Sequence, residues 1–194
     1  MTKIIGISGT NGAGKDTVGQ LLESRHNYMF ISVTAILRRG LEELGLPINR
    51  EQLRQLSAEW RRQEGLGVLV NRAMDIFNSS DHNYAGIAMA SMRNPGEAEE
   101  IHRLGGQMLW VDADPRLRYN RIQKNMAARR RESEDMVSYA KFLSDEQAEM
   151  YYPSDGDRAN LSMADVKTVC DIFLVNDDES LDALDAKLVQ ALEL

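Results

Sequence analysis

The chain has 194 residues, a length that supports one domain around a single core. Its hydrophobic fraction of 43% and charged fraction of 27% are ordinary for a globular protein, and they exclude wholesale disorder and fibrous repeats. The net charge of −7 argues against broad electrostatic binding of nucleic acid. No stretch is long and apolar enough for a membrane span or a signal peptide, and the single cysteine, Cys170, excludes an internal disulfide. We therefore expect a cytoplasmic protein that binds neither membrane nor nucleic acid.

Short apolar runs alternate along the chain with longer amphipathic runs. The apolar runs predict five strands, at Lys3–Ser8, Tyr28–Ser32, Tyr84–Met92, Gln107–Ala113 and Asp171–Val175. The amphipathic runs predict helices at Lys15–Arg25, Thr34–Leu44, Glu51–Glu64, Leu66–Phe77, Glu97–Leu104, from Pro115 onward, at Ser133–Met150 and over Leu181–Leu192. Apolar strands separated by helices are typical of a parallel sheet covered on both faces. The pattern thus predicts a three-layer α/β/α fold whose ligands bind beyond the carboxyl ends of the strands.

The segment Gly9–Lys15 reads GTNGAGK and matches the phosphate-binding pattern G-x-x-x-x-G-K. It lies between a predicted strand and a predicted helix, which is the context that supports this motif over a ligand-free glycine turn. Its glycines let backbone N–H groups point at phosphate oxygens, and the helix N-terminus adds partial positive charge. This P-loop predicts an ATP site formed by Gly9, Asn11, Gly12, Ala13, Gly14 and Lys15.

The residue after the P-loop lysine departs from the usual pattern. The motif expects Ser or Thr there to hold Mg²⁺, but the chain has Asp16 followed by Thr17. A carboxylate beside a triphosphate is repelled unless a cation separates them, so we interpret Asp16 as a ligand of Mg²⁺ or of its waters. The alternative is that Asp16 only complements the helix dipole. Thr17 is then expected to contact an inner phosphate.

The segment Phe30–Arg38 (FISVTAILR) resembles the HIS-T-G-D-x-L-R segment of adenylate kinase and its relatives, the nucleoside monophosphate kinases. Archaeal adenylate-kinase-like and deoxynucleoside monophosphate kinase branches of that family also include members with Asp after the P-loop lysine. The resemblance implies that Arg38 grips the phosphate of the acceptor nucleotide. It also implies that Ser32 and Thr34 line the acceptor pocket.

The segment Ala90–Glu97 (ASMRNPGE) is similar to the D-G-x-R-x-x-x-E segment of the same family. The similarity implies that Arg93 is the second arginine on the acceptor phosphate. Ala90 stands where the family has an aspartate, and this strengthens the case for Asp16 as the carboxylate near the metal. Asp112 is the other candidate for that role.

Three further segments resemble the family in position. In Pro115–Arg131, Arg121 matches the arginine that packs over the donor base, and one of Arg129, Arg130 and Arg131 is expected to act from a lid over residues 126–160. The loop at Asn176 matches the backbone that meets the donor adenine. Residues 33–82 are expected to be a helical acceptor-binding insertion, from which Arg61 and Arg62 are weaker candidates to approach the acceptor.

The resemblance as a whole implies a single P-loop NTPase domain over residues 1–194 with catalytic roles for Lys15, Arg38, Arg93 and Arg121. It implies transfer of a phosphoryl group from ATP, with Mg²⁺, to a nucleoside or deoxynucleoside monophosphate. Two alternatives remain open: a kinase of another small acceptor, such as dephospho-coenzyme A or phosphomevalonate, and a nucleotide-binding switch with slow ATPase activity. The sequence does not determine the oligomeric state.

Overall fold

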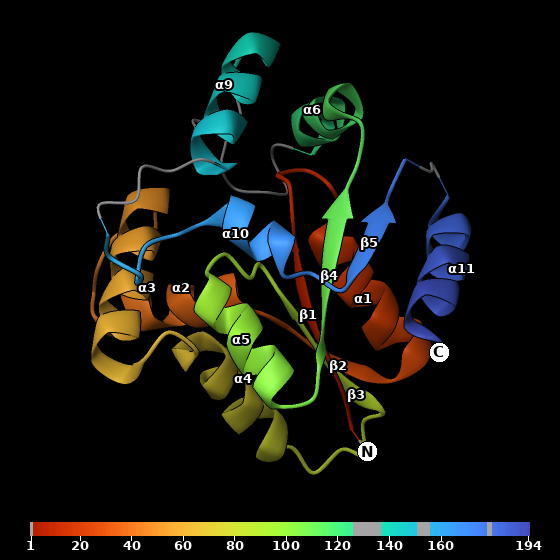
Figure 1. Cartoon of the computed structure of the whole chain (residues 1–194), viewed down its shortest axis with the longest axis horizontal. Coiled ribbons are helices and arrows are strands. Elements are labelled where there is room, and N and C mark those ends of the chain that lie inside the picture. Colours follow the sequence, from red (N-terminus) through yellow and green to blue (C-terminus); the bar gives the residue numbers. More distant parts are fainter. Residues whose placement is uncertain (1, 126–136, 151–155, 178–179) are drawn as a thin grey trace.

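A computed structural model describes residues 2–125, 137–150, 156–177 and 180–194 (Figure 1). Its sheet has the order β2-β3-β1-β4-β5, and every neighbouring pair is parallel. The strands are β1 (Lys3–Gly9), β2 (Tyr28–Ser32), β3 (Gly86–Ala90), β4 (Gln107–Asp112) and β5 (Ile172–Val175). The chain order reverses around the central β1, so the P-loop after β1 lies at the point where ligands bind in open parallel sheets.

Helices cover both faces of the sheet, as the apolar strands predict. One face packs against α1 (Lys15–His26) and α11 (Leu181–Leu192). The other packs against α2 (Val33–Glu43), α4 (Val68–Asn78), α5 (Pro95–Arg103) and α10 (Met163–Thr168). The remaining helices are α3 (Arg50–Glu64), which packs on α2, and α6 (Pro115–Lys124) and α9 (Tyr139–Met150), which lie beyond the carboxyl end of β4 (Figure 1).

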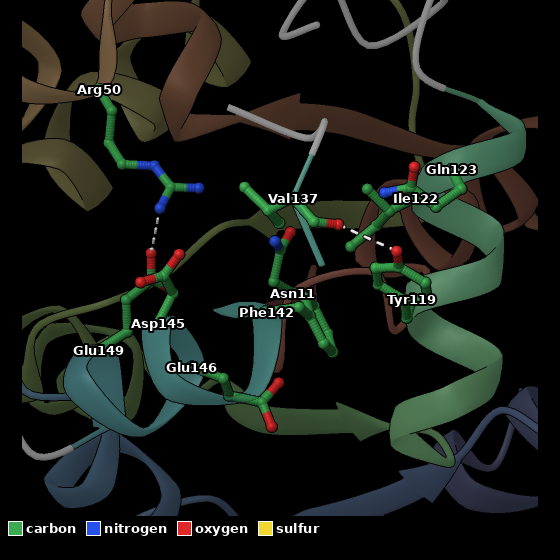
Figure 2. Close-up of a pocket in the computed structure, with 10 residues that line it drawn as sticks. All are labelled: Asn11, Arg50, Tyr119, Ile122, Gln123, Val137, Phe142, Asp145, Glu146 and Glu149. Carbon is green, nitrogen blue, oxygen red and sulfur yellow. Dashed lines mark hydrogen bonds and ion pairs between the residues drawn. The ribbon is translucent and has the colours of Figure 1, made fainter. Parts of the chain in front are cut away.

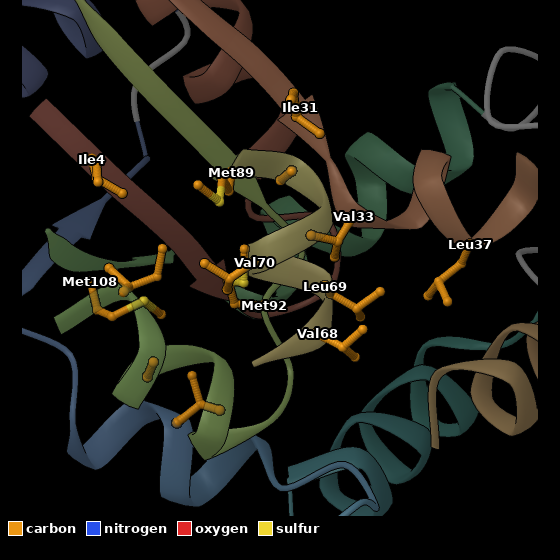
Figure 3. Packing of buried hydrophobic residues seen from close by; sticks show 14 of the residues in the cluster. Ile4, Ile31, Val33, Leu37, Val68, Leu69, Val70, Met89, Met92 and Met108 are labelled. Carbon is orange, nitrogen blue, oxygen red and sulfur yellow. The ribbon is translucent and has the colours of Figure 1, made fainter. Parts of the chain in front are cut away.

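The core divides into two apolar clusters because successive strand residues point to opposite faces. On β4, Met108 and Trp110 belong to the cluster under α4 and α5, whereas Leu109 and Val111 belong to the cluster under α1 and α11. Figure 3 shows the first cluster, where Met89 and Met108 of the sheet meet Val70 of α4. This alternation fixes the register of the sheet and therefore the position of the residues that follow each strand.

The predicted third strand differs from the observed one at both ends. Strand β3 begins at Gly86 and not at Tyr84, and just before it the N–H of Ala85 bonds to the carbonyl of Asn27. The strand ends at Ala90, since Ser91 leaves it with a positive φ of 75°.

Apart from α9, the described helices that were predicted begin within two residues of their predicted starts. Helix α10 was not predicted, because six residues are too few to show a helical period. Helix α9 begins at Tyr139, where the Ser138 hydroxyl accepts a hydrogen bond from the N–H of Lys141, and the predicted start at Ser133 lies outside the described residues. Residues 126–136 and 151–155, which include part of the expected lid and Arg129, Arg130 and Arg131, lie outside the described residues. Among the helices that are described, none has the length and apolarity to span a membrane.

Candidate active site

The P-loop turns between β1 and α1 with three glycines in left-handed conformations. Gly9, Gly12 and Gly14 have φ of 139°, 80° and 96°. A Cβ at Gly9 would lie 1.9 Å from the carbonyl oxygen of Val111, and one at Gly14 would lie 2.5 Å from Nδ2 of Asn176. These positions therefore need glycine both for their backbone angles and for space.

Lys15 lies across its own loop. Its Nζ donates hydrogen bonds to the carbonyl oxygens of Gly9, at 2.9 Å, and Thr10, at 2.7 Å. The ammonium group is thereby held at the concave side of the loop, beside the N-terminus of α1, where both the charge and the helix dipole favour an anion.

Asn176, which directly follows β5, holds the P-loop through a side-chain hydrogen bond. Its side-chain amide donates to the carbonyl of Ala13 at 2.8 Å, and its backbone N–H donates to the carbonyl of Asp112 at 2.7 Å. Arg121 in turn donates to the carbonyl of Asn176 at 2.8 Å. Sequence reasoning assigned Asn176 to the donor adenine but did not foresee this link, because a strand end and a loop 163 residues apart show no common pattern.

A first cavity of about 710 Å³ opens over the P-loop. Of the residues that the sequence singles out, its lining includes Asn11, Gly12, Gly14, Lys15, Asp16, Thr17, Ser32, Thr34, Arg38, Arg93, Arg121 and Asn176. Gly9 and Ala13 do not line it, because Gly9 packs on Val111 and Ala13 is fully buried. The fold thus gathers residues from five separate segments of the chain around one cavity.

A second cavity, of about 650 Å³, lies between α2, α3 and α9. It shares Thr34, Arg38, Ser91 and Arg93 with the first cavity. Within the described residues, Nε of Arg38 is buried without a hydrogen-bond partner. Arg38 and Arg93 therefore lie where the two cavities meet, and Arg38 has unused donor capacity there.

Ser91, which follows the position where the family has an aspartate, lies where the two cavities meet. Ala90 is fully buried in the cluster under α1 and α11, whereas Ser91 lines both cavities. The family segment has glycine at the position of Ser91, and a φ of 75° is one that glycine adopts freely and serine does not. Backbone strain of this kind at the junction of two cavities is typical of a functional site.

Arg93 is oriented by a buried acidic residue. Its backbone N–H donates to Oε2 of Glu97 at 2.7 Å, and Asn94 caps α5 in a capping box with the same glutamate. Glu97 also binds Arg61 at 2.5 Å, and the two side chains are 0% and 1% exposed. Arg61 is therefore paired with Glu97, and it also lines the second cavity, so its approach to an acceptor stays a prediction.

Arg62, the other arginine expected in the insertion, lies outside the two cavities. It pairs with Asp157 at the surface and lines neither of the two cavities. Sequence reasoning missed two other residues of the second cavity, Arg50 and Glu149. Arg50 directly follows Asn49, the N-cap of α3, and a helix cap carries no information about a cavity.

The two candidate metal carboxylates have different surroundings. Oδ1 of Asp112 accepts hydrogen bonds from the Thr10 hydroxyl, at 2.7 Å, and from the N–H of Ala113, and it lies 3.6 Å from Arg118. Asp16 is exposed in the first turn of α1 and lines the first cavity. The carboxylate of Asp16 is therefore available to a metal ion, whereas the carboxylate of Asp112 is engaged by Thr10, Ala113 and Arg118.

The single cysteine has no role in this site. Cys170 is buried, and burial together with the neighbouring charge of Asp171 raises the pKa of its thiol to about 12. The thiol is therefore neutral near pH 7 and packs as a small core residue, as the sequence suggested.

A family model described as an AAA domain matches residues 5–140, which include the P-loop, Arg38, Arg93 and Arg121. The chain belongs to this AAA domain family. No curated protein matches it in sequence.

Several solved structures have a similar fold at low sequence identity, and two of them are shikimate kinases. Shikimate kinase from Bacteroides thetaiotaomicron has 15% identity and a TM-score of 0.64, with 99% of each chain covered. Protein TT1252 from Thermus thermophilus has 20% identity and a TM-score of 0.58, with 97% of each covered. Shikimate kinase from Acinetobacter baumannii, in complex with shikimate, has 15% identity and a TM-score of 0.57, over 98% of this chain and 92% of that one. This AAA domain therefore has the α/β fold of P-loop kinases.

Proposed function

We propose that the protein transfers the γ-phosphoryl group of ATP to a nucleoside or deoxynucleoside monophosphate. The observation that carries this proposal is the meeting of two ligand-sized cavities at a pair of arginines, Arg38 and Arg93. Small-molecule sites have volumes of roughly 300–1,000 Å³, so each cavity has room for one nucleotide. A donor over the P-loop and an acceptor in the second cavity would then have their phosphates face to face.

The chemistry needs no nucleophile from the protein. A phosphate oxygen of the acceptor attacks the γ-phosphorus of ATP, the bond from that phosphorus to the bridging oxygen breaks, and ADP leaves with the electron pair. Catalysis of this step consists of alignment and neutralisation of charge. We assign alignment of the acceptor to Arg38 and Arg93, with Ser32 and Thr34 beside them, and neutralisation of the donor phosphates to Lys15 and the P-loop amides. Arg121 and the loop at Asn176 are assigned to the base of the donor.

Mg²⁺ fits this site through Asp16. In the part of the chain that the structure describes, no group of three or more His, Cys, Asp or Glu side chains lies close enough together to hold a metal. Mg²⁺ at nucleotide sites is usually bound by one or two carboxylates, water and the phosphates themselves. Asp16, with Thr17 beside it, supplies such a carboxylate, and the ion would neutralise charge on the triphosphate.

Substituting alanine for Arg38 or Arg93 is expected to raise KM for the acceptor and lower kcat, while the affinity for ATP changes little. Each loss should reach about 2–5 kcal/mol in kcat/KM, the scale for removing one partner of a buried charge pair. Steady-state kinetics with each substrate varied in turn measures this. Arg39→Ala is the matched control, because Arg39 is exposed, pairs with Glu43 and lines neither of the two cavities. An equal loss of ATP affinity in the Arg38 and Arg93 variants would contradict the assignment of the two cavities.

Asp16→Asn is expected to raise the Mg²⁺ concentration for half-maximal activity about tenfold, or about 1.4 kcal/mol. Binding of metal-free ATP should stay the same or improve, because a negative charge near the phosphates is removed. Magnesium titrations at fixed ATP compare this variant with Asp182→Asn, which removes a carboxylate in the first turn of α11 that pairs with Arg25 and does not itself line the first cavity. Superimposable curves for Asp16→Asn and the wild type would leave Asp16 as a helix-dipole residue and would point to Asp112.

The proposed function itself is tested by release of ADP across a panel of acceptors. The panel contains ribo- and deoxyribonucleoside monophosphates, dephospho-coenzyme A, phosphomevalonate and shikimate, the last because two of the similar structures are shikimate kinases. We expect stimulation by a nucleoside monophosphate. Stimulation by another acceptor alone would replace the proposal, and hydrolysis that no acceptor stimulates would indicate a nucleotide-binding switch.

A further inference from the structure

Besides Arg38 and Arg93, the second cavity is lined by Arg50, Arg54 and Arg61, and the proposed function gives none of these three a role. Arg50 begins α3 and points across the cavity to α9, where its Nη1 lies 2.9 Å from Oε1 of Glu149 (Figure 2). Nη1 of Arg93 lies 3.7 Å from the other oxygen of the same carboxylate, Oε2. One carboxylate thus spans two guanidinium groups that come from separate elements, and all three side chains line the second cavity.

We propose that Arg50 binds the phosphate of the acceptor together with Arg93, and that Glu149 competes with this phosphate for the two arginines. The inference rests on the proposed function, because it concerns the acceptor cavity of the same reaction. Guanidinium groups bind carboxylate and phosphate oxygens through the same forked geometry, so a side chain that binds both arginines marks where an anion binds. Arg38, with its buried and unpartnered Nε on the wall of the same cavity, adds a further donor for that anion.

The exposure of these side chains distinguishes an exchangeable contact from a structural ion pair. Arg50, Arg93 and Glu149 are 40%, 29% and 28% exposed. By contrast, the side chains of the structural pair Arg61 and Glu97 are 1% and 0% exposed. Arg61 also donates a hydrogen bond to the carbonyl of Ala159, and Glu97 also accepts one from the N–H of Asn94. Partly exposed pairs are screened by water and contribute little free energy. A phosphate with more than one negative charge is therefore able to displace the single charge of Glu149.

Helix α9 holds Glu149 in this position through a second glutamate. Glu146, three residues earlier, binds the buried guanidinium of Arg118, with one contact of 2.9 Å. Arg118 also donates to the carbonyl oxygens of Ala113, at 2.8 Å, and of Asn11 in the P-loop, at 3.2 Å. Glu146 thus joins α9 to Arg118, which bonds to the P-loop, and Glu149 on the same helix reaches Arg50 (Figure 2).

The substitution Glu149→Gln distinguishes the proposal from a purely structural role for Glu149, because the two predict opposite changes in affinity for the acceptor. If Glu149 competes with the acceptor, Glu149→Gln tightens binding of the acceptor about two- to fivefold, the range that exposed ion pairs contribute. If Glu149 only holds the arginines in place, the same change weakens binding. Arg50→Ala is expected to weaken binding about tenfold or more, and Arg50→Lys to recover part of it, because the charge remains but the fork is lost.

Calorimetric titration with each nucleoside monophosphate of the panel, without ATP, measures these affinities on the full chain. Arg62→Ala is the control on the same helix, since Arg62 pairs with Asp157 outside both cavities, and thermal melting of every variant verifies folding. Tighter binding by Glu149→Gln with weaker binding by Arg50→Ala supports the proposal. Weaker binding by Glu149→Gln, or unchanged binding by Arg50→Ala and Arg50→Lys, overturns it while the proposed function stands. If the wild type binds no nucleoside monophosphate, both proposals fail.

Discussion

Substituting alanine for Lys15 is expected to abolish turnover of ATP in a chain that stays folded. The Nζ of Lys15 donates hydrogen bonds to carbonyl oxygens of its own loop, at 2.7 and 2.9 Å. Its loss removes the full positive charge at the donor phosphates, and removal of a single group that stabilises transition-state charge typically costs about 10²–10³-fold in kcat. We expect at least this loss, because Lys15 carries a full charge where such groups are often neutral.

Coupled measurement of ADP release, beside circular dichroism and thermal melting, tests this expectation. Lys124→Ala serves as the control, because Lys124 is exposed near the end of α6 and lines none of the cavities described above. A folded Lys15→Ala protein with nearly normal turnover would contradict the phosphotransferase mechanism as a whole. A protein that binds ATP as before but turns it over slowly would place Lys15 in catalysis more than in binding.

The parts of the fold that the sequence predicted are those that depend on local pattern. The five strands and the P-loop are recognisable because an apolar run, a glycine loop and a helix follow one another along the chain. The start of β3 was not, since Tyr84 and Ala85 are as apolar as the strand that follows, and the hydrogen bond from Ala85 to Asn27 forms only in the folded chain. That bond joins segments 58 residues apart, and no window of sequence contains it.

The same distinction applies to the candidate site. Arg38 and Arg93 were predicted because each lies in a segment with a recognisable neighbourhood, and the fold brings both to the junction of the cavities. Arg50 and Glu149 are separated by 99 residues, and the sequence of neither helix distinguishes them from surface charges. Arg61 also lines the second cavity, but its sequence neighbourhood did not indicate that its guanidinium pairs with the buried Glu97.

The pair of Arg61 and Glu97 leads to the largest expected change in stability. Arg61→Leu would leave the carboxylate of Glu97 buried with only the N–H groups of Arg93 and Asn94 as donors. It would also leave the carbonyl of Ala159 without the hydrogen bond from Nη1 of Arg61, at 3.0 Å. Removing one partner of a buried ion pair costs about 3–5 kcal/mol, so we expect a loss of this size in the free energy of unfolding.

Urea denaturation measures this loss, with the adjacent residue as the control. Arg62→Ala removes an exposed arginine from the same turn of α3, and we expect it to unfold close to the wild-type midpoint because surface pairs contribute little. Similar midpoints for Arg61→Leu and Arg62→Ala would mean that the buried pair is not a determinant of stability. Because Glu97 also fixes the backbone of Arg93, any Arg61→Leu protein that remains folded should show a higher KM for the acceptor with an unchanged KM for ATP. This split would separate the pair's effect on the acceptor cavity from a general loss of folded protein, which lowers the apparent kcat and leaves both KM values unchanged.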